Sequence, residues 1–171
     1  STASVYPENM DDAQVGLSAF GQYDVRSNPL QMAMVSAAIA NQGVLMTPNL
    51  VENVLSSNLS VLMQSQPNIF SQPMSKETAQ SVKEMMIGAV SRGVSGNARV
   101  QGVEVAGKTG TAQNGKGEPY TLWFTGFAPA DNPEVAVAVV IADGGGQGQG
   151  GVGNSLAAPV ARKVIEAVLR K

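Results

Sequence analysis

A strand-like segment with a polar centre runs from residue 105 to residue 113 and reads Val-Ala-Gly-Lys-Thr-Gly-Thr-Ala-Gln. The alternation of valine with other residues begins already at 103–106, as in an extended strand. Alternate side chains of a strand point to opposite faces, so the lysine and the second glycine share one face and the threonines share the other. An edge strand offers unpaired N–H and C=O groups to an extended peptide, and a glycine lets a ligand approach closely. The segment therefore predicts a substrate-facing edge strand with four candidate site residues, namely Lys108, Thr109, Gly110 and Thr111.

Two more strands follow this segment at short intervals. Residues 114–119, Asn-Gly-Lys-Gly-Glu-Pro, form a turn-rich break. Residues 120–128 are rich in aromatic residues and threonine, which favours a second strand. After a turn at 131–133, the valine-rich residues 135–142 predict a third strand that is apolar on both faces. Three successive strands joined by short turns predict an antiparallel meander.

Three helices are predicted around this meander. Asn28, followed by proline, suits a helix start, and Gly43 suits the end of the same helix. Ser75 caps a second helix that Gly93 ends, and a last helix runs from about Ser155 to the end of the chain. The apolar residues at helical spacing in the second helix, which we interpret as core packing, are Val82, Met85, Met86, Ala89 and Val90.

The remaining segments carry weaker patterns. Residues 1–28 are polar and loop-like, and residues 44–55 alternate weakly, which predicts a short edge strand. Residues 56–74 form a connection rich in Ser, Asn, Gln and Pro. Residues 144–153 predict a flexible loop of glycine and glutamine.

The composition narrows the chemistry that the chain can perform. Of its 171 residues, 43% are hydrophobic and 14% are charged, which favours a packed domain over disorder. A net charge of -2 with scattered basic residues argues against a nucleic-acid partner. The chain has no Cys and no His, so a serine or threonine nucleophile would need a lysine, a carboxylate or an N-terminal amine as its base. We expect neither a cofactor nor a bound metal.

Two nucleotide-binding patterns compete with the strand interpretation. Residues 102–109 match the Walker A string, and the strand at 135–142 ends in Asp143, as a Walker B strand does. A P-loop needs a helix that begins at its lysine, but residues 110–119 contain three glycines and a proline. Each glycine costs a helix about 1 kcal/mol and the proline about 3 kcal/mol, so this alternative is disfavoured. Residues 148–153 match GxGxxG, but a Rossmann unit needs a further parallel strand, and only the predicted last helix follows.

Four blocks follow one another along the chain: Gly21-Gln22 with residues 28–33 and 39–43, residues 105–113, residues 123–130, and Ala158-Pro159-Val160. In this order and spacing they resemble the class B penicillin-binding proteins, nearest to the actinobacterial cell-division type. Lys-Thr-Gly is the third active-site signature of that family. The family usually has a second glycine shortly after Gly-Gln, where this chain has Tyr23-Asp24, which changes the expected shape of that loop.

The resemblance implies an α+β fold of the penicillin-binding and serine β-lactamase-like transpeptidase type, an antiparallel sheet flanked by helices. It identifies residues 1–171 as the C-terminal portion of a single transpeptidase domain. The family's nucleophile motif, Ser-x-x-Lys, does not occur in the chain. Formal Ser-x-Asn strings at 56–58 and 95–97 follow the Gly-Gln block, whereas the family's motif precedes it, so we interpret them as coincidental. Both motifs are expected in a preceding segment, which stays attached because a free half-domain would expose apolar surface.

The function implied by the resemblance is peptidoglycan cross-linking by D,D-transpeptidation through a serine acyl-enzyme, with inhibition by β-lactams. Lys108 would keep the site electropositive and take part in proton transfer, and the hydroxyls of Thr109 and Thr111 would bind the substrate carboxylate. Gly110 would leave room for the substrate, and the backbone N–H of Thr111 would be one oxyanion donor. Trp123 is expected mainly as a buried strand aromatic. A β-lactam sensor domain and a serine β-lactamase of the same fold are the alternatives, followed by a P-loop NTPase.

The resemblance also implies partners and a location. The partners would be peptidoglycan stem peptides, β-lactams, the preceding segment of the domain, and cell-wall or division proteins. The longest apolar run, 135–142, is too short to cross a bilayer. The implied location is the extracytoplasmic face of the cell membrane, with an anchoring N-terminal helix outside this chain.

Overall fold

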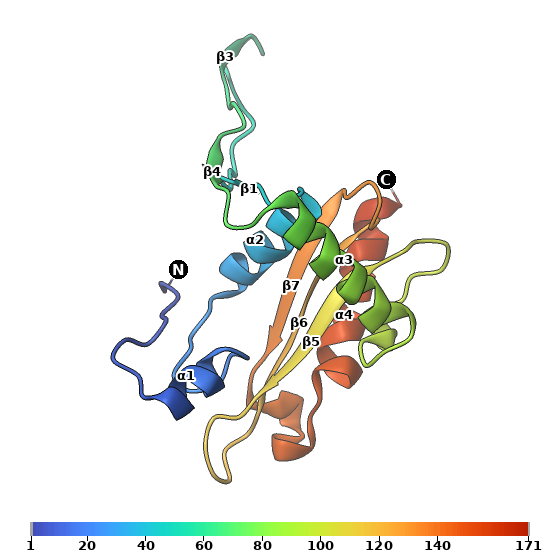
Figure 1. The fold of residues 1–171 in the computed structure, drawn as a ribbon. Coiled ribbons are helices and arrows are strands. Elements are labelled where there is room, and N and C mark those ends of the chain that lie inside the picture. Colours follow the sequence, from blue (N-terminus) through green and yellow to red (C-terminus); the bar gives the residue numbers. More distant parts are fainter. Residues whose placement is uncertain (1, 171) are drawn as a thin grey trace.

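The computed structural model describes residues 2–170 and has an α+β architecture (Figure 1). Its centre is a three-stranded antiparallel sheet made of β5 (Ala106–Ala112), β6 (Thr121–Ala128) and β7 (Val135–Ile141). The strands lie in the order β5-β6-β7, each beside its neighbour in sequence. The predicted antiparallel meander is therefore confirmed.

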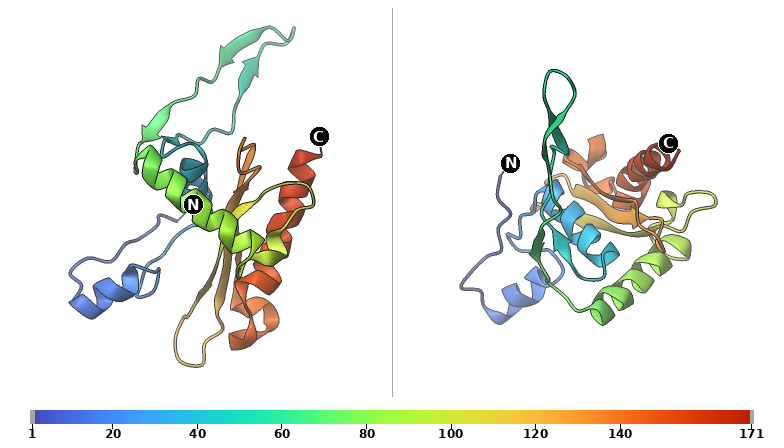
Figure 2. Two further views of the ribbon diagram at one scale, coloured as in Figure 1. Left: turned by 45° about the vertical axis from the view of Figure 1, so that its right-hand side comes forward. Right: turned by 90° about the horizontal axis from the view of Figure 1, so that it is seen from above.

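Helices cover both faces of this sheet (Figure 2). One face packs against α2 (Pro29–Ala40), and the opposite face packs against α4 (Gly153–Leu169). A third helix, α3 (Lys76–Ser91), lies beside β5. The expected sheet flanked by helices is confirmed. None of the helices within residues 2–170 is both long and apolar enough to cross a membrane.

The larger apolar cluster fills the space between the sheet and α4. Phe124 of β6 is fully buried in it, and small residues of α4, such as Ala157 and Ala161, let the helix approach the sheet closely. A second cluster on the opposite face contains Ile39 of α2 and Phe127 of β6. The sheet is thus held from both sides, which fixes the position of β5.

The methionine stripe of α3 is only partly core, contrary to our prediction. Met86 and Val90 are buried as expected, but Met85 is 66% exposed. The side of α3 that carries Met85 faces a groove beside β5 instead of the packed interior. The predicted helix is therefore correct, but its buried face is narrower than predicted.

Local hydrogen bonds explain where the helices begin and end. At the start of α2, Asn28 Oδ1 accepts the backbone N–H of Gln31 at 2.8 Å, as predicted for an N-cap. Gly43, with φ of +91°, follows the end of α2 in a left-handed conformation that glycine adopts readily. The Ser75 hydroxyl caps α3. In the same turn, a hydrogen bond from its own backbone N–H and another from Ser75 lower the pKa of the exposed Glu77 carboxyl.

Three stretches that we predicted as loops contain regular structure. Within residues 1–28, a short helix, α1 (Asp12–Ser18), begins with a capping box. Asp11 Oδ1 accepts the N–H of Gln14 at 2.9 Å, and Gln14 Oε1 accepts the N–H of Asp11 at 3.0 Å. The capping pattern is visible in the sequence, but the helix is too short to show a hydrophobic period.

Residues 44–74 form two pairs of short strands instead of one edge strand and a loop. The inner pair is β1 (Leu45–Met46) with β4 (Ile69–Ser71), and the outer pair is β2 (Asn53–Leu55) with β3 (Val61–Gln64). They project away from the sheet (Figure 1). Every side chain of β2 and β3 is exposed, so backbone pairing forms this hairpin without burial.

The segment predicted as a flexible loop folds into two 3₁₀ turns, η2 (Asp143–Gly146) and η3 (Gly148–Gly150). Gly144 donates its N–H to the carbonyl of Tyr120 at 2.7 Å, and Tyr120 donates its N–H to the carbonyl of Gly148 at 3.3 Å. These bonds tie the turns to the beginning of β6. The last helix, α4, consequently begins at Gly153, slightly earlier than the predicted Ser155.

Candidate active site

The strand β5 carries all four candidate residues at an open edge of the sheet. Within residues 2–170 it pairs only with β6. Thr109 donates its backbone N–H to Ser95 Oγ at 3.2 Å, and therefore away from β6. Backbone groups of every second residue point the same way in an antiparallel ladder, so the N–H and C=O of Thr111 also face the open edge. An extended ligand could pair with the strand at Thr111.

The side chains of β5 divide between the two faces as predicted. Thr109 Oγ1 lies 3.3 Å from Ser95 Oγ, and Thr111 Oγ1 accepts the backbone N–H of Gly153 at 3.4 Å. Both threonines therefore face the turn after α3 and the start of α4. Lys108 faces the other way, toward the groove between α2 and α3. A ligand lying along the edge would meet the hydroxyls on one side and the ammonium group on the other.

Lys108 borders an apolar groove of about 370 Å³ between α2 and α3. Its ammonium group donates to the carbonyl of Thr109. No carboxylate within residues 2–170 lies at ion-pairing distance from this lysine, so its charge is available to an anionic ligand. The groove is lined mainly by apolar side chains, namely Val35, Ile39, Val82, Met85, Met86 and Ala89.

A hydroxyl pair, one member buried and the other half-buried, fixes α2 against the sheet next to this groove. Ser36 Oγ lies 2.6 Å from Thr125 Oγ1, which itself lies opposite Lys108 in the ladder. The hydroxyl of Thr125 also reaches the carbonyl of Met32 at 3.0 Å. Because the two hydroxyls and the carbonyl are hydrogen-bonded to one another, α2 stays against the sheet and no unpaired polar atom of theirs lines the groove.

Gly110 and Trp123 lie directly opposite each other on β5 and β6. A side chain at Gly110 would begin 3.2 Å from Trp123 Cβ, which is a tight contact. Trp123 itself is half-buried in the sheet rather than fully enclosed. A side chain at Gly110 would therefore crowd Trp123, and the predicted role of this glycine in leaving room for a substrate stays a prediction.

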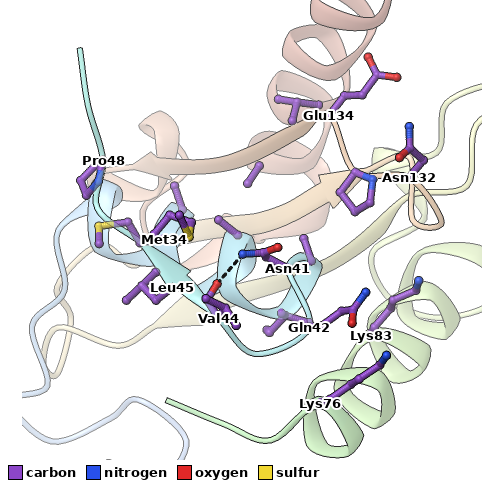
Figure 3. Close-up of a pocket in the computed structure, with 18 of the residues that line it drawn as sticks. Met34, Asn41, Gln42, Val44, Leu45, Pro48, Lys76, Lys83, Asn132 and Glu134 are labelled. Carbon is purple, nitrogen blue, oxygen red and sulfur yellow. Dashed lines mark hydrogen bonds between the residues drawn. The ribbon is translucent and has the colours of Figure 1, made fainter. Parts of the chain in front are cut away.

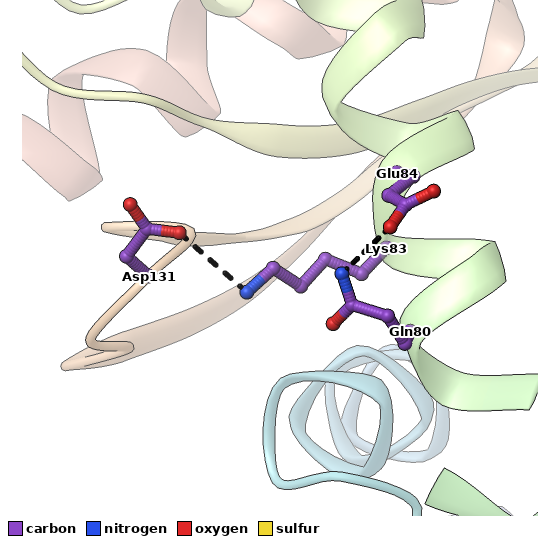
Figure 4. Close-up of polar contacts among 4 residues, drawn as sticks. All are labelled: Gln80, Lys83, Glu84 and Asp131. Atoms are coloured by element: carbon purple, nitrogen blue, oxygen red, sulfur yellow. Dashed lines mark hydrogen bonds and ion pairs between the residues drawn. The ribbon is translucent and has the colours of Figure 1, made fainter. Parts of the chain in front are cut away.

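A larger cavity of about 790 Å³ lies away from β5 (Figure 3). It is enclosed by the end of α2, β1, the start of α3 and the turn between β6 and β7. An ion pair at its border joins Lys83 Nζ to Asp131 Oδ1 at 3.7 Å, and Gln80 donates to Glu84 at 2.8 Å on the same helix (Figure 4). None of the candidate residues of β5 lines this cavity, so its size does not make it the candidate site.

The nucleotide-binding alternatives do not fit the geometry. The second half of the Walker-like string, with Lys108, lies on β5, and the strand continues to Ala112 where a P-loop would begin a helix. The backbone N–H groups near Lys108 are therefore arranged for strand pairing and form no phosphate-binding loop. Within residues 2–170 there is also no group of three or more His, Cys, Asp or Glu residues that could hold a metal ion.

Two further residues contact the candidate threonines, although the sequence predicted no role for them at the site. They are Ser95, in the turn after α3, and Gly153, at the start of α4. A third residue, Asn97 of the same turn, hydrogen-bonds Asn154, the neighbour of Gly153. Ser95 and Asn97 belong to a string that we interpreted as coincidental. Their contacts join residues that are 14 and 57 positions apart, which no local pattern reveals.

The comparison with known sequences places these observations in a family. Residues 3–166 match the family described as the penicillin binding protein transpeptidase domain. The chain is 38% identical over 165 residues to the peptidoglycan D,D-transpeptidase PbpA of Mycolicibacterium smegmatis, which covers 95% of the chain and 33% of that protein. It is 32% identical over 171 residues to the stage V sporulation protein D of Bacillus subtilis, which covers 96% and 26%. The chain thus spans about a quarter to a third of the length of these curated relatives.

Solved structures agree with this assignment. The structure of penicillin-binding protein A from M. tuberculosis, a ceftriaxone acyl-enzyme complex, superposes with a TM-score of 0.91 at 35% identity and covers 98% of this chain and 38% of its own. The D,D-transpeptidase domain of a peptidoglycan glycosyltransferase from Eggerthella lenta gives a TM-score of 0.73 at 37% identity, over 92% and 36%. The predicted transpeptidase fold and the resemblance to actinobacterial class B proteins are confirmed. Since the match includes β5 with its Lys-Thr-Gly segment, the chain belongs to the penicillin-binding protein transpeptidase family.

Proposed function

We propose that this chain is the C-terminal part of a transpeptidase domain that cross-links peptidoglycan through a serine acyl-enzyme. The observation that carries the proposal is the open edge of β5, where among residues 2–170 the N–H of Thr111 faces no neighbouring strand and Lys108 has no carboxylate partner. The names of the similar proteins support it, since one relative is called a peptidoglycan D,D-transpeptidase and one solved structure a ceftriaxone acyl-enzyme complex. The β-lactam and the stem peptide would occupy the same edge.

In the first half of the reaction, a serine of the preceding segment attacks the carbonyl carbon of the D-Ala-D-Ala bond. The carbonyl oxygen gains negative charge, and the N–H of Thr111 donates to it as one oxyanion donor. The carbon–nitrogen bond then breaks, the terminal D-alanine leaves with a proton on its amine, and the acyl-enzyme remains. Lys108 keeps the site electropositive during this step, and the hydroxyls of Thr109 and Thr111 hold the substrate carboxylate.

In the second half, an amine of a neighbouring peptidoglycan strand attacks the acyl-enzyme carbonyl. The amine loses a proton, the new amide bond forms, and the serine hydroxyl is restored. The same N–H of Thr111 serves this second tetrahedral intermediate. A β-lactam sensor or a β-lactamase would share the first half of the reaction and differ in the fate of the acyl-enzyme. Only the transpeptidase would form a cross-link and release D-alanine in the same reaction, so this observation distinguishes it from both.

The preceding segment would pack against this chain in two places. One is the apolar groove beside Lys108, where a helix carrying the nucleophilic serine would lie within reach of β5. The other is the outer edge of β7, which has no strand beside it within residues 2–170 although most of its residues are apolar. An open apolar edge is a hazard for aggregation, so a strand of the preceding segment would stabilise it. The proposal further puts the protein at the extracytoplasmic membrane face, where its substrate is.

Labelling with a fluorescent penicillin tests the proposal directly. The isolated 171-residue chain is expected to remain unlabelled because it has no Ser-x-x-Lys motif, whereas the same chain joined to its preceding segment is expected to carry one covalent label. Labelled protein is detected on a denaturing gel, and an excess of unlabelled β-lactam serves as the control that blocks the site. A covalent label on a serine of the isolated chain, or no label on the joined protein, would contradict the proposal.

Replacing Lys108 tests its electrostatic role. In the joined protein, Lys108→Ala is expected to slow acylation by a β-lactam about ten- to a hundredfold, since a charged donor is worth about 1.5–3 kcal/mol. The second-order acylation rate constant is the measurement. Lys116→Ala is the matched control, because Lys116 is exposed in the turn between β5 and β6. Equal rates for Lys108→Ala and the control would show that this strand does not line the active site.

A further inference from the structure

Ser95 is a completely buried hydroxyl next to the candidate site. It accepts the backbone N–H of Thr109 at 3.2 Å and donates its own proton to Thr109 Oγ1 at 3.3 Å. Buried polar groups normally have hydrogen-bond partners, and here both partners belong to one residue of β5. As a result, the Thr109 hydroxyl oxygen accepts a hydrogen bond from Ser95, and its own O–H can donate to a ligand.

Asn97, two residues further along the same turn, holds the start of α4. Its backbone N–H donates to Asn154 Oδ1 at 3.0 Å, and its side-chain amide donates to the carbonyl of Asn154 at 3.0 Å. The preceding residue, Gly153, donates its N–H to Thr111 Oγ1 at 3.4 Å. Like that of Thr109, the hydroxyl oxygen of Thr111 therefore accepts a hydrogen bond from the protein, and its own O–H can donate to a ligand.

Gly153 can make this contact only because it has no side chain. A Cβ at this position would lie 2.6 Å from the carbonyl oxygens of both Gly110 and Trp123. Real Cβ atoms do not approach carbonyl oxygens so closely, so a larger residue would push the start of α4 away from β5. The two hydrogen bonds that Asn97 donates to Asn154 keep the helix start in this tight position.

From these contacts we propose that Ser95 and Asn97 are positioning residues that orient the hydroxyls of Thr109 and Thr111 as hydrogen-bond donors. Each hydroxyl already accepts one hydrogen bond from the protein, which leaves its proton to be donated at the open edge of β5. Such a pair favours a carboxylate over a neutral ester, because a carboxylate can only accept hydrogen bonds at both oxygens. The inference rests on the proposed function, in which these threonines hold the substrate carboxylate, and adds what sets the direction of their hydroxyls.

The test compares a penicillin with its methyl ester in the joined protein. Ser95→Ala is expected to slow acylation by the free acid about three- to tenfold, the usual effect of one neutral hydrogen bond. The rate of acylation by the methyl ester is expected to differ from that of the wild type by less than about twofold, because the ester has no carboxylate to accept hydrogen bonds from the oriented hydroxyls. Asn97→Ala, at an exposed position that does not threaten folding, is expected to act in the same direction with a smaller effect. Ser91→Ala is the matched control, since Ser91 is an exposed serine at the end of α3.

A double-mutant cycle separates positioning from general loosening. In a Thr109→Val background, Ser95→Ala is expected to slow acylation by the free acid no further, because the hydroxyl that it orients is already gone. Equal slowing of acid and ester in both variants, or an undiminished effect of Ser95→Ala in the Thr109→Val background, would overturn the inference. If both single variants acylate like wild type, the inference also fails while the proposed function stands. A wild-type protein that forms no adduct at all refutes the proposed function, and this inference with it.

Discussion

Thr111→Pro is expected to cause the largest loss of acylation of any substitution on β5, about a hundred- to a thousandfold, as removal of one oxyanion donor does elsewhere. Proline has no backbone N–H, and the N–H of Thr111 faces the open edge of the strand, where that of Thr109 is already bonded to Ser95. The substitution also removes the hydroxyl that accepts the Gly153 N–H. The measurement is the second-order rate constant of acylation by one β-lactam in the joined protein.

Thr111→Ala provides the matched control for this prediction. It removes the same hydroxyl but keeps the backbone N–H, so it is expected to slow acylation about tenfold or less, in line with one neutral hydrogen bond. Proline is tolerated on edge strands when its nitrogen points away from the ladder, so both variants are expected to fold, which circular dichroism would check. If Thr111→Pro folds and acylates as fast as Thr111→Ala, the N–H of Thr111 is not an oxyanion donor.

The sheet could be predicted because its signals are local. The strands predicted at 120–128 and 135–142 appear as Thr121–Ala128 and Val135–Ile141, since aromatic residues and threonine mark the first, a valine-rich run marks the second, and turn residues separate them. The outer hairpin β2–β3 could not be predicted in the same way. Its residues are exposed on both faces, so no alternation between buried and exposed side chains distinguishes it from a polar loop.

In the candidate site, too, the residues of a local motif could be predicted and those that act through long-range contacts could not. Lys108 and Thr111 could be proposed from the sequence, because both belong to one short motif whose strand geometry sets their directions. The hydrogen bonds to the threonines come from Ser95 and Gly153, which lie in other elements and meet β5 only in the folded chain. A three-dimensional structure is needed to find residues that act through packing of this kind.

Phe124→Ala is expected to give the largest loss of stability in the chain. The ring is fully buried between the sheet and α4, and truncation of a buried phenylalanine costs about 3–5 kcal/mol. Its edge also fills the space above Gly107, where a Cβ would lie 2.4 Å from Phe124 Cζ. Gly107→Ala should therefore cost about 1–3 kcal/mol by overpacking, one residue before the lysine of the active strand.

The two substitutions together test whether this contact determines the packing. The added methyl group occupies part of the space that the ring leaves, so the double variant is expected to lose less stability than the sum of the single losses, by about 0.5–3 kcal/mol. The free energy of unfolding is measured by urea denaturation of the joined protein. Val140→Ala, on β7 at 38% exposure, is the control and is expected to cost less than either single substitution. Strict additivity of the two losses would mean that Gly107 and Phe124 do not share one packing space, and the close approach of β5 to β6 would need another explanation.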